Sequence, residues 1–193
     1  MIFVVFHGSF GNPEENWFPY LAEALEPLGE EIIIPQMPTE NHEEFSKLGE
    51  KTIPKKQSLD NWLKAFESLL PKLKGKRLCF VGHSIGCVFI LHAANKFNLQ
   101  LDSAVFVAPF LKKLDPKLVS FNIVNSTFYK DDFDFAKLRK LIPLSYAVYS
   151  NNDPYVDIEQ SLKFAQKMGS QKIIHNGGGH LGSIFTHVFH LVE

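Results

Sequence analysis

The chain has 193 residues, 45% of them hydrophobic and 21% charged, and its 20 Lys and Arg against 21 Asp and Glu give a formal net charge of -1. This length predicts a single domain over residues 1–193, and the balanced charge lacks the basic field that a nucleic-acid-binding protein needs. Two cysteines are too few for a disulfide scaffold.

The first residues, Met1–Gly8, have no basic region before their apolar run and no small-residue cleavage site after it, so we expect no signal peptide. No run approaches the roughly 18 apolar residues that cross a membrane. We therefore expect a cytoplasmic protein, monomeric or weakly dimeric, with neither a membrane nor a nucleic acid as its partner.

Short apolar, β-branched runs alternate with helical periodicity along the whole chain. This alternation is typical of βαβ units around a mostly parallel sheet with helices on both faces. Nearly continuous apolar strands fit a sheet that is covered on both sides. We expect six strands, at residues 2–7, 31–35, 77–81, 103–107, 145–150 and 172–175.

Helical periodicity follows Trp17, Ser58 and Asp157. Ser58 and Asp157 carry the oxygen acceptors expected at helix N-caps, whereas Gly29 and Gly169 are expected where helices end. His187 and His190 share a predicted C-terminal helix, but without the Glu of a zinc-protease motif they predict no metal site.

Two segments are too long for ordinary connections, residues 36–57 and residues 108–132. Loops of this length in a compact domain usually have a function, for example as lids or binding loops. We therefore treat residues 108–140 as a candidate small lid region within the single domain.

The segment Gly82-His83-Ser84-Ile85-Gly86 lies directly between the third expected strand and an apolar helical run. In that context, the pattern G-x-S-x-G predicts the nucleophile elbow of α/β-hydrolases. The turn is strained, so the residues two before and two after the serine must lack bulk. The alternative interpretation is an ordinary glycine-rich turn with Ser84 as a helix cap.

A serine nucleophile needs a base, and the base needs a carboxylate that orients it. In α/β-hydrolases the acid and the base follow the serine in that order, each after a late strand. Asp153 follows the fifth expected strand, and His180 follows the sixth after three glycines. Asp157 and His175 are weaker alternatives, because the first opens a helix and the second ends a strand.

An oxyanion hole requires two N–H donors. One is expected from Ile85, which follows the nucleophile, and the other from the loop after the first strand, where Ser9 is the best match and Phe10 the second. His7 and His83 border the same edge and are expected to hold loops through structural hydrogen bonds. His92 is expected to be a satisfied core histidine.

Phenylalanine supplies 18 of the residues and is therefore unusually common. Those on strands and helix faces are predicted core residues. Phe10 and Phe110 are predicted to contact substrate. Further phenylalanines gather in or near the candidate lid, at Phe121, Phe128, Phe133 and Phe135.

Several motifs together resemble the retinoblastoma-binding-protein-9-like (YdeN-like) family of small serine hydrolases. The resemblance implies a compact α/β-hydrolase fold with strand order 2-1-3-4-5-6 and a triad of Ser84, Asp153 and His180. The motifs that carry it are His7-Gly8, Asn16-Trp17-Phe18-Pro19, Pro35 with Met37-Pro38, Asp60-Asn61-Trp62, Val81 to Cys87, Asp153 with Val156, and Gly178-Gly179-His180.

The expected function is a serine hydrolase, carboxylesterase-like, that cleaves a small ester or amide through an acyl-enzyme. Its partner would be a small-molecule acyl substrate, and the chemistry requires neither a metal nor another cofactor. One alternative is a hydrolase-like scaffold that binds a protein without catalysis. Another is a thioesterase, for which Lys112, Lys113 and Lys117 are the nearby basic residues.

Overall fold

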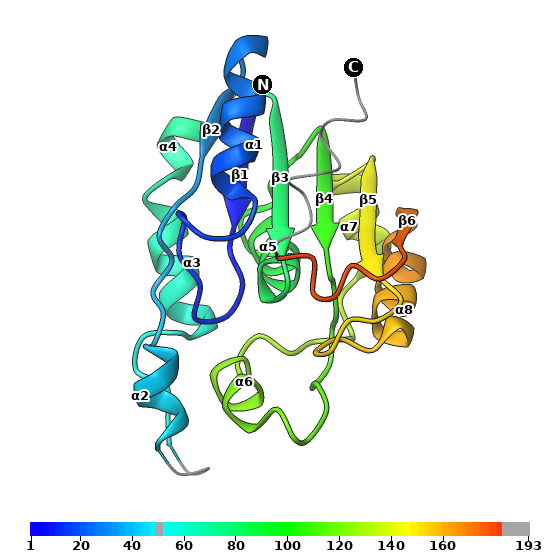
Figure 1. Cartoon of the computed structure of the whole chain (residues 1–193). Coiled ribbons are helices and arrows are strands. Elements are labelled where there is room, and N and C mark those ends of the chain that lie inside the picture. The colour runs from blue at the N-terminus through cyan, green and yellow to red at the C-terminus, as the bar shows by residue number, and fades with distance from the viewer. Residues whose placement is uncertain (49–51, 183–193) are drawn as a thin grey trace.

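A computed structural model describes residues 1–48 and 52–182 of the chain. Within these residues, six strands form one parallel sheet in the order β2-β1-β3-β4-β5-β6 (Figure 1), which confirms the expected order. The C-terminal helix expected around His187 and His190 lies outside the described residues. The strands are β1 (Ile2–Phe6), β2 (Glu31–Ile33), β3 (Leu78–His83), β4 (Ser103–Val107), β5 (Ser145–Ser150) and β6 (Gln171–His175).

The helices begin and end close to their predicted signals. Ser58 and Asp157 accept hydrogen bonds from N–H groups of the helices that follow them, and Gly169 ends its helix in a left-handed conformation. The helices are α1 (Phe18–Leu25), α2 (His42–Ser46), α3 (Leu59–Glu67), α4 (Leu70–Leu73), α5 (Ile85–Phe97), α6 (Val119–Val124), α7 (Phe135–Leu141) and α8 (Ile158–Met168), with a 3₁₀ turn η1 (Glu26–Leu28) after α1.

The sheet has a separate hydrophobic core on each face, because side chains alternate along a strand. On β1, Phe6 points to the core that contains α3 and α5, whereas Val5 points to the core that contains α1. Each core buries one tryptophan: Trp62 lies on the α5 side and Trp17 on the α1 side.

The larger core accounts for much of the phenylalanine excess. Phe6 lies edge-on to Phe66, Phe80 and Phe89, with ring centroids 5.7, 5.5 and 5.0 Å away. This geometry is the preferred one for aromatic pairs, which stabilise a core beyond the area they bury. Phe6, the last residue of β1, is therefore packed against α3, β3 and α5.

Two short helices occupy the long segments that had no clear period in the sequence. Both α2 and α6 lie beyond the carboxyl ends of the strands (Figure 1), and the rings of His42 and Phe121 bridge them at 5.4 Å. With five and six residues, these helices are too short to leave a periodic pattern. They cover the carboxyl end of the sheet, where Ser84 follows β3.

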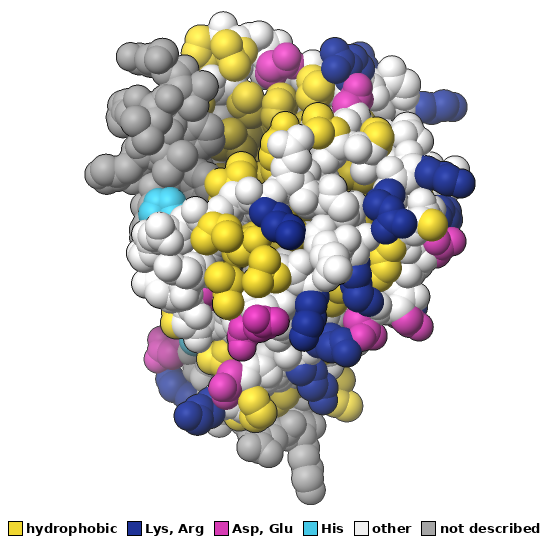
Figure 2. Space-filling view, turned by 90° about the vertical axis from the view of Figure 1, so that its right-hand side faces the viewer, with side chains coloured by type: hydrophobic (Ala, Val, Ile, Leu, Met, Phe, Trp, Pro, Cys, Tyr) yellow, Lys and Arg dark blue, Asp and Glu magenta, His cyan; other side chains and the backbone are white. Residues whose placement is uncertain are grey.

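The edge strand β6 is only partly covered by the described residues. Ile173 and Ile174 are 47% and 51% exposed. On this side of the molecule, lysine and arginine side chains are interspersed with acidic and apolar ones (Figure 2), and charges near a sheet edge disfavour its pairing with other chains. Among the described helices, none combines the length and hydropathy required to cross a membrane.

The contact between the start of α5 and the end of β1 leaves no room for a side chain at Gly86. A Cβ there would lie 2.4 Å from the carbonyl oxygen of Phe6 and 2.9 Å from that of His7. We expect Gly86→Ala to lower the free energy of unfolding by about 3 kcal/mol, because backbone atoms must move. Urea denaturation measures this loss.

The matched control is Gly29→Asn. A Cβ at Gly29 has no atom within 4 Å, and its φ of +70° is one that Asn tolerates. We expect a change of about 1 kcal/mol or less. Equal losses in the two variants would contradict the proposed close contact.

Candidate active site

Ser84 occupies the turn between β3 and α5 with φ 56° and ψ -121°, a conformation that L-residues rarely adopt. Its N–H donates to the carbonyl oxygen of Val107 at 2.8 Å, which ties the turn to β4. A Cβ on Gly82 would lie 2.7 Å from the backbone nitrogen of Cys87. The turn therefore closes only because glycine stands there, as the motif predicted.

Ile85 is the first residue of α5, which has 13 residues. N–H groups in the first turn of a helix have no acceptor within the helix, and the helix dipole adds positive potential there. The N–H of Ile85 is therefore available to a negative charge that develops beside Ser84.

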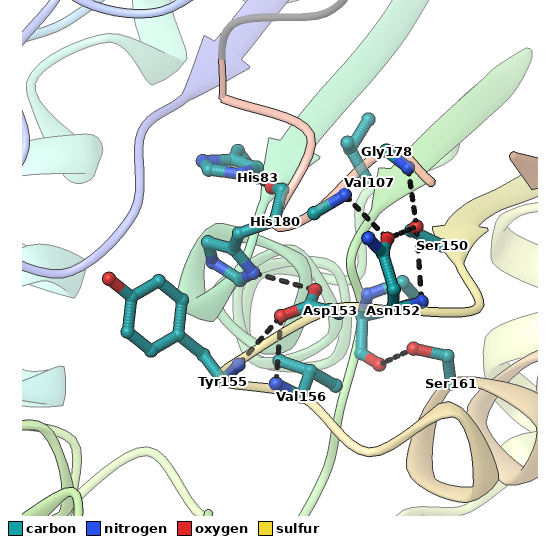
Figure 3. A network of polar contacts seen from close by, with 12 residues as sticks. His83, Val107, Ser150, Asn152, Asp153, Tyr155, Val156, Ser161, Gly178 and His180 are labelled. Atoms are coloured by element: carbon teal, nitrogen blue, oxygen red, sulfur yellow. Dashed lines mark hydrogen bonds and ion pairs between the residues drawn. The ribbon is translucent and has the colours of Figure 1, made fainter. Parts of the chain in front are cut away.

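Asp153 and His180 form a hydrogen-bonded pair next to this turn (Figure 3). Oδ2 of Asp153 lies 2.7 Å from Nδ1 of His180, and the Asp153 side chain is 3% exposed. Its other oxygen, Oδ1, accepts from the N–H groups of Tyr155 at 2.8 Å and Val156 at 3.0 Å. The carboxylate is thus fixed by the backbone, and Nδ1 of His180 donates to it, which leaves Nε2 for chemistry.

The loop that carries the acid is paired with the loop that carries the base. Each side chain in the run 150–153 bonds one residue in the run 177–180, and we call this set of four contacts the loop pairing. Its first three pairs were not predicted, although the sequence shows a polar run after one strand and glycines after the next. The pairs are Ser150 with Gly178 (2.9 Å), Asn151 with Gly177 (3.0 Å), Asn152 with Gly179 (2.8 Å) and Asp153 with His180 (2.7 Å).

Two buried histidines hold the neighbouring loops, as expected from the sequence. Nε2 of His83 donates to the carbonyl oxygen of His180 at 2.9 Å, and the two rings pack at 4.8 Å. Nδ1 of His7 donates to the carbonyl oxygen of Gly8 at 2.8 Å, and its Nε2 accepts from the N–H of Met37 at 3.1 Å. Burial lowers the pKa of His7, and it lowers the pKa of His83 to about 3.

A cavity of about 190 Å³ brings the predicted residues together. Ser84, His180 and Ser9 all line it, although they come from three separate parts of the sequence. Its apolar wall is formed by Leu114, Phe121 and Tyr155. Phe121 and Leu114 both come from the candidate lid, residues 108–140, although nothing in the sequence singled out Leu114. Tyr155 had no signal beyond its position close to Asp153.

Phe10 and Phe110 were predicted to contact substrate, but neither lines the cavity. Phe110 has no exposed surface and lies in the larger core, because the chain turns inward after β4. Phe10 lies behind the cavity wall, with its ring 5.4 Å from that of Phe121. Its φ is +59°, and its N–H donates to Oε1 of Gln57 at 3.0 Å.

Asp157, the alternative to Asp153 as the acid, and His92 make structural contacts elsewhere. Asp157 caps α8, where it accepts from the N–H of Glu159. Nε2 of His92 hydrogen-bonds the carbonyl oxygen of Phe128 at 2.8 Å, which satisfies the half-buried ring. Among the described residues, no group of three or more His, Cys, Asp or Glu side chains could hold a metal ion.

The sequence matches one protein-family model over most of its length. Residues 3–187 match the family model described as serine hydrolase. No curated protein matches the sequence.

Solved structures with the same fold include the ydeN gene product of B. subtilis, which is 23% identical, with a TM-score of 0.79 over 98% of this chain and 96% of that one. A YdeN-like hydrolase of Pectobacterium atrosepticum is 18% identical, with a TM-score of 0.57 over 94% and 80% of the two chains. A carboxylesterase structure of the thaumarchaeon Nitrososphaera gargenis is 13% identical, with a TM-score of 0.70 over 98% and 86%. At these identities the likeness establishes an α/β-hydrolase fold.

The buried, neutral His83 makes stability depend on pH. Its pKa falls from 6.5 in the unfolded chain to about 3 in the folded one, so the unfolded chain binds more protons between these values. Stability therefore falls as the pH drops below 6.5. From pH 7 to pH 5, His83 should account for about 2 kcal/mol of the decrease in the free energy of unfolding.

Urea denaturation of the wild type and His83→Gln at both pH values measures this contribution. His7 and His92, whose pKa values burial also lowers, remain in the variant and keep part of the pH dependence. The variant should therefore lose less stability on acidification than the wild type. An identical pH dependence in both proteins would refute the assignment.

Proposed function

The chain belongs to the serine hydrolase family, and from this premise we propose that it cleaves a small ester or amide through an acyl-enzyme formed on Ser84. His180 acts as the base and Asp153 as the acid that orients it. The proposal rests on one observation above all: a buried carboxylate is bound to Nδ1 of His180, and His180 shares a cavity with a serine in the strained turn.

In the first half of the reaction, Nε2 of His180 takes the proton of the Ser84 hydroxyl while Oγ attacks the acyl carbon. Asp153 stabilises the imidazolium that forms, and the imidazolium then gives its proton to the departing alcohol or amine. In the second half, His180 takes a proton from water, the hydroxide attacks the acyl-enzyme, and Ser84 regains its proton as the acid leaves.

Two N–H groups would stabilise the oxyanion in both halves. One belongs to Ile85, at the start of α5. For the second, the sequence left Ser9 and Phe10 open. The bond from the Phe10 N–H to Gln57 favours Ser9, since the Phe10 donor is already engaged and Ser9 lines the cavity.

The cavity favours a small acyl substrate. Its volume of about 190 Å³ is below the range of typical drug-sized sites, and Leu114, Phe121 and Tyr155 give it one apolar side. A thioester with a phosphate-bearing carrier would need cations at the entrance. Lys112, one of the three candidates, is already paired with Asp131 at 2.7 Å, so we favour an ester or amide.

Replacement of the nucleophile should abolish the chemistry. We expect Ser84→Ala to lose covalent labelling by a fluorophosphonate probe, and its kcat on p-nitrophenyl acetate to fall by about 10⁶-fold. For Asp153→Asn we expect kcat to fall by about 10⁴-fold. Asp157→Asn is the matched control, because Asn also caps helices and Asp157 is a cap. Undiminished labelling of Ser84→Ala would exclude Ser84, and an unreactive wild type would favour a binding protein.

The size of the cavity should appear in the choice of substrate. With p-nitrophenyl esters we expect kcat/KM to fall by about tenfold or more between the butyrate and the octanoate. The longer acyl chain would collide with the apolar wall formed by Leu114, Phe121 and Tyr155. Phe121→Ala should reduce this difference by opening the wall. Equal rates for all chain lengths in the wild type would argue against a small acyl pocket.

A further inference from the structure

Two buried amide side chains lie beside the proposed oxyanion loop. Gln57, just before α3, and Asn125, at the end of α6, have no exposed surface. Burial of a polar side chain costs free energy unless its hydrogen bonds are made inside the protein. The hydrogen bonds of these two amides are made to each other and to the loop after β1.

The two amides grip two successive residues of that loop. Oε1 of Gln57 accepts from the Phe10 N–H at 3.0 Å, and Nε2 of Gln57 donates to Oδ1 of Asn125 at 2.9 Å. The hydroxyl of Ser9 donates to the same Oδ1 at 2.7 Å. We call Gln57, Asn125 and these three bonds the amide clamp.

The clamp holds Ser9 from the side opposite its own N–H. That N–H belongs to the Gly8–Ser9 peptide, whose carbonyl oxygen accepts from Nδ1 of His7 at 2.8 Å, so the clamp supplies the second of the two anchors between which Ser9 is oriented. The bond to the Phe10 N–H fixes the peptide plane that follows Ser9, and the bond to Asn125 fixes the Ser9 side chain. Neither bond uses the N–H of Ser9 itself. The clamp also supports the positive φ of Phe10, +59°, which the backbone alone disfavours.

The same clamp connects the loop to the cavity wall. Asn125 follows α6, which carries Phe121. A second bond joins the same two segments, from the N–H of Leu59 to Oγ1 of Thr127 at 2.9 Å. The oxyanion loop, the start of α3 and the end of α6 are therefore held as one unit.

We propose that Gln57 is a positioning residue for the oxyanion hole. Gln57 accepts from the Phe10 N–H and donates to Asn125, which in turn accepts from the Ser9 hydroxyl. Through these bonds Gln57 keeps the N–H of Ser9 aimed into the cavity beside Ser84. This inference rests on the proposed function, because it assigns a role within that catalytic site. Gln57 itself is buried and does not line the cavity.

The test compares Gln57→Leu, which keeps approximate volume but removes both hydrogen-bonding groups, with the wild type on p-nitrophenyl acetate. We expect kcat to fall by about 10- to 100-fold with KM changed less than about threefold, because misplacement of one donor affects mainly the transition state. Affinity for a small alkyl boronic acid, which forms a tetrahedral adduct, should fall by a similar factor.

The matched control is Ser145→Ala. The Ser145 hydroxyl is buried and bonded to that of Ser170 at 2.7 Å, at the opposite end of the sheet. Its loss should reduce stability while leaving kcat and boronic acid affinity unchanged. If both variants are destabilised and lose boronic acid affinity equally, the role of Gln57 is merely structural and the proposal fails.

A second variant covers the case in which Gln57→Leu does not fold. Ser9→Ala removes only the hydroxyl that binds Asn125 and should lower kcat by about three- to tenfold, again with little change in KM. Wild-type kcat and boronic acid affinity in whichever variant folds would overturn the proposal. An unreactive wild type would overturn the proposed function and this inference with it, whereas reactive, unaffected variants overturn this inference alone.

Discussion

The strained turn at Ser84 is the constraint from which the arrangement of the site follows. The turn closes because Gly82 and Gly86 have no side chains, and this lets the first turn of α5 touch the backbone at the end of β1. Since β1 and β3 are adjacent parallel strands, the loop that leaves β1 emerges beside Ser84. One tight turn thus brings a serine, a helix N-terminus and a second loop to the same point.

The other half of the site depends on strand register. In the sheet, Ser150 lies opposite His175, so the loops after β5 and β6 leave the edge level with each other. The loop pairing then holds the two loops together as far as Asp153 and His180. A fixed sheet, a polar run and three glycines together place an imidazole that no single contact could hold.

Local patterns predicted most of the fold, whereas contacts between distant segments left no pattern. Apolar runs and caps marked the strands and long helices, and the glycine spacing marked Ser84. Phe110 was assigned to the pocket from its position within the candidate lid, but only packing determines that its ring turns inward. Gln57 and Asn125 are 68 residues apart and meet in the interior, so nothing near either one indicated the pair.

The separation of the two largest cores gives each face of the sheet its own fluorophore. The chain has two tryptophans, one in each core. Trp17 lies near the ring of His83, with centroids 6.3 Å apart, and Trp62 lies near that of His7, at 5.3 Å. Single replacement of either tryptophan by Phe would leave an emission signal from one side only, so the opening of the two layers could be followed separately in real time.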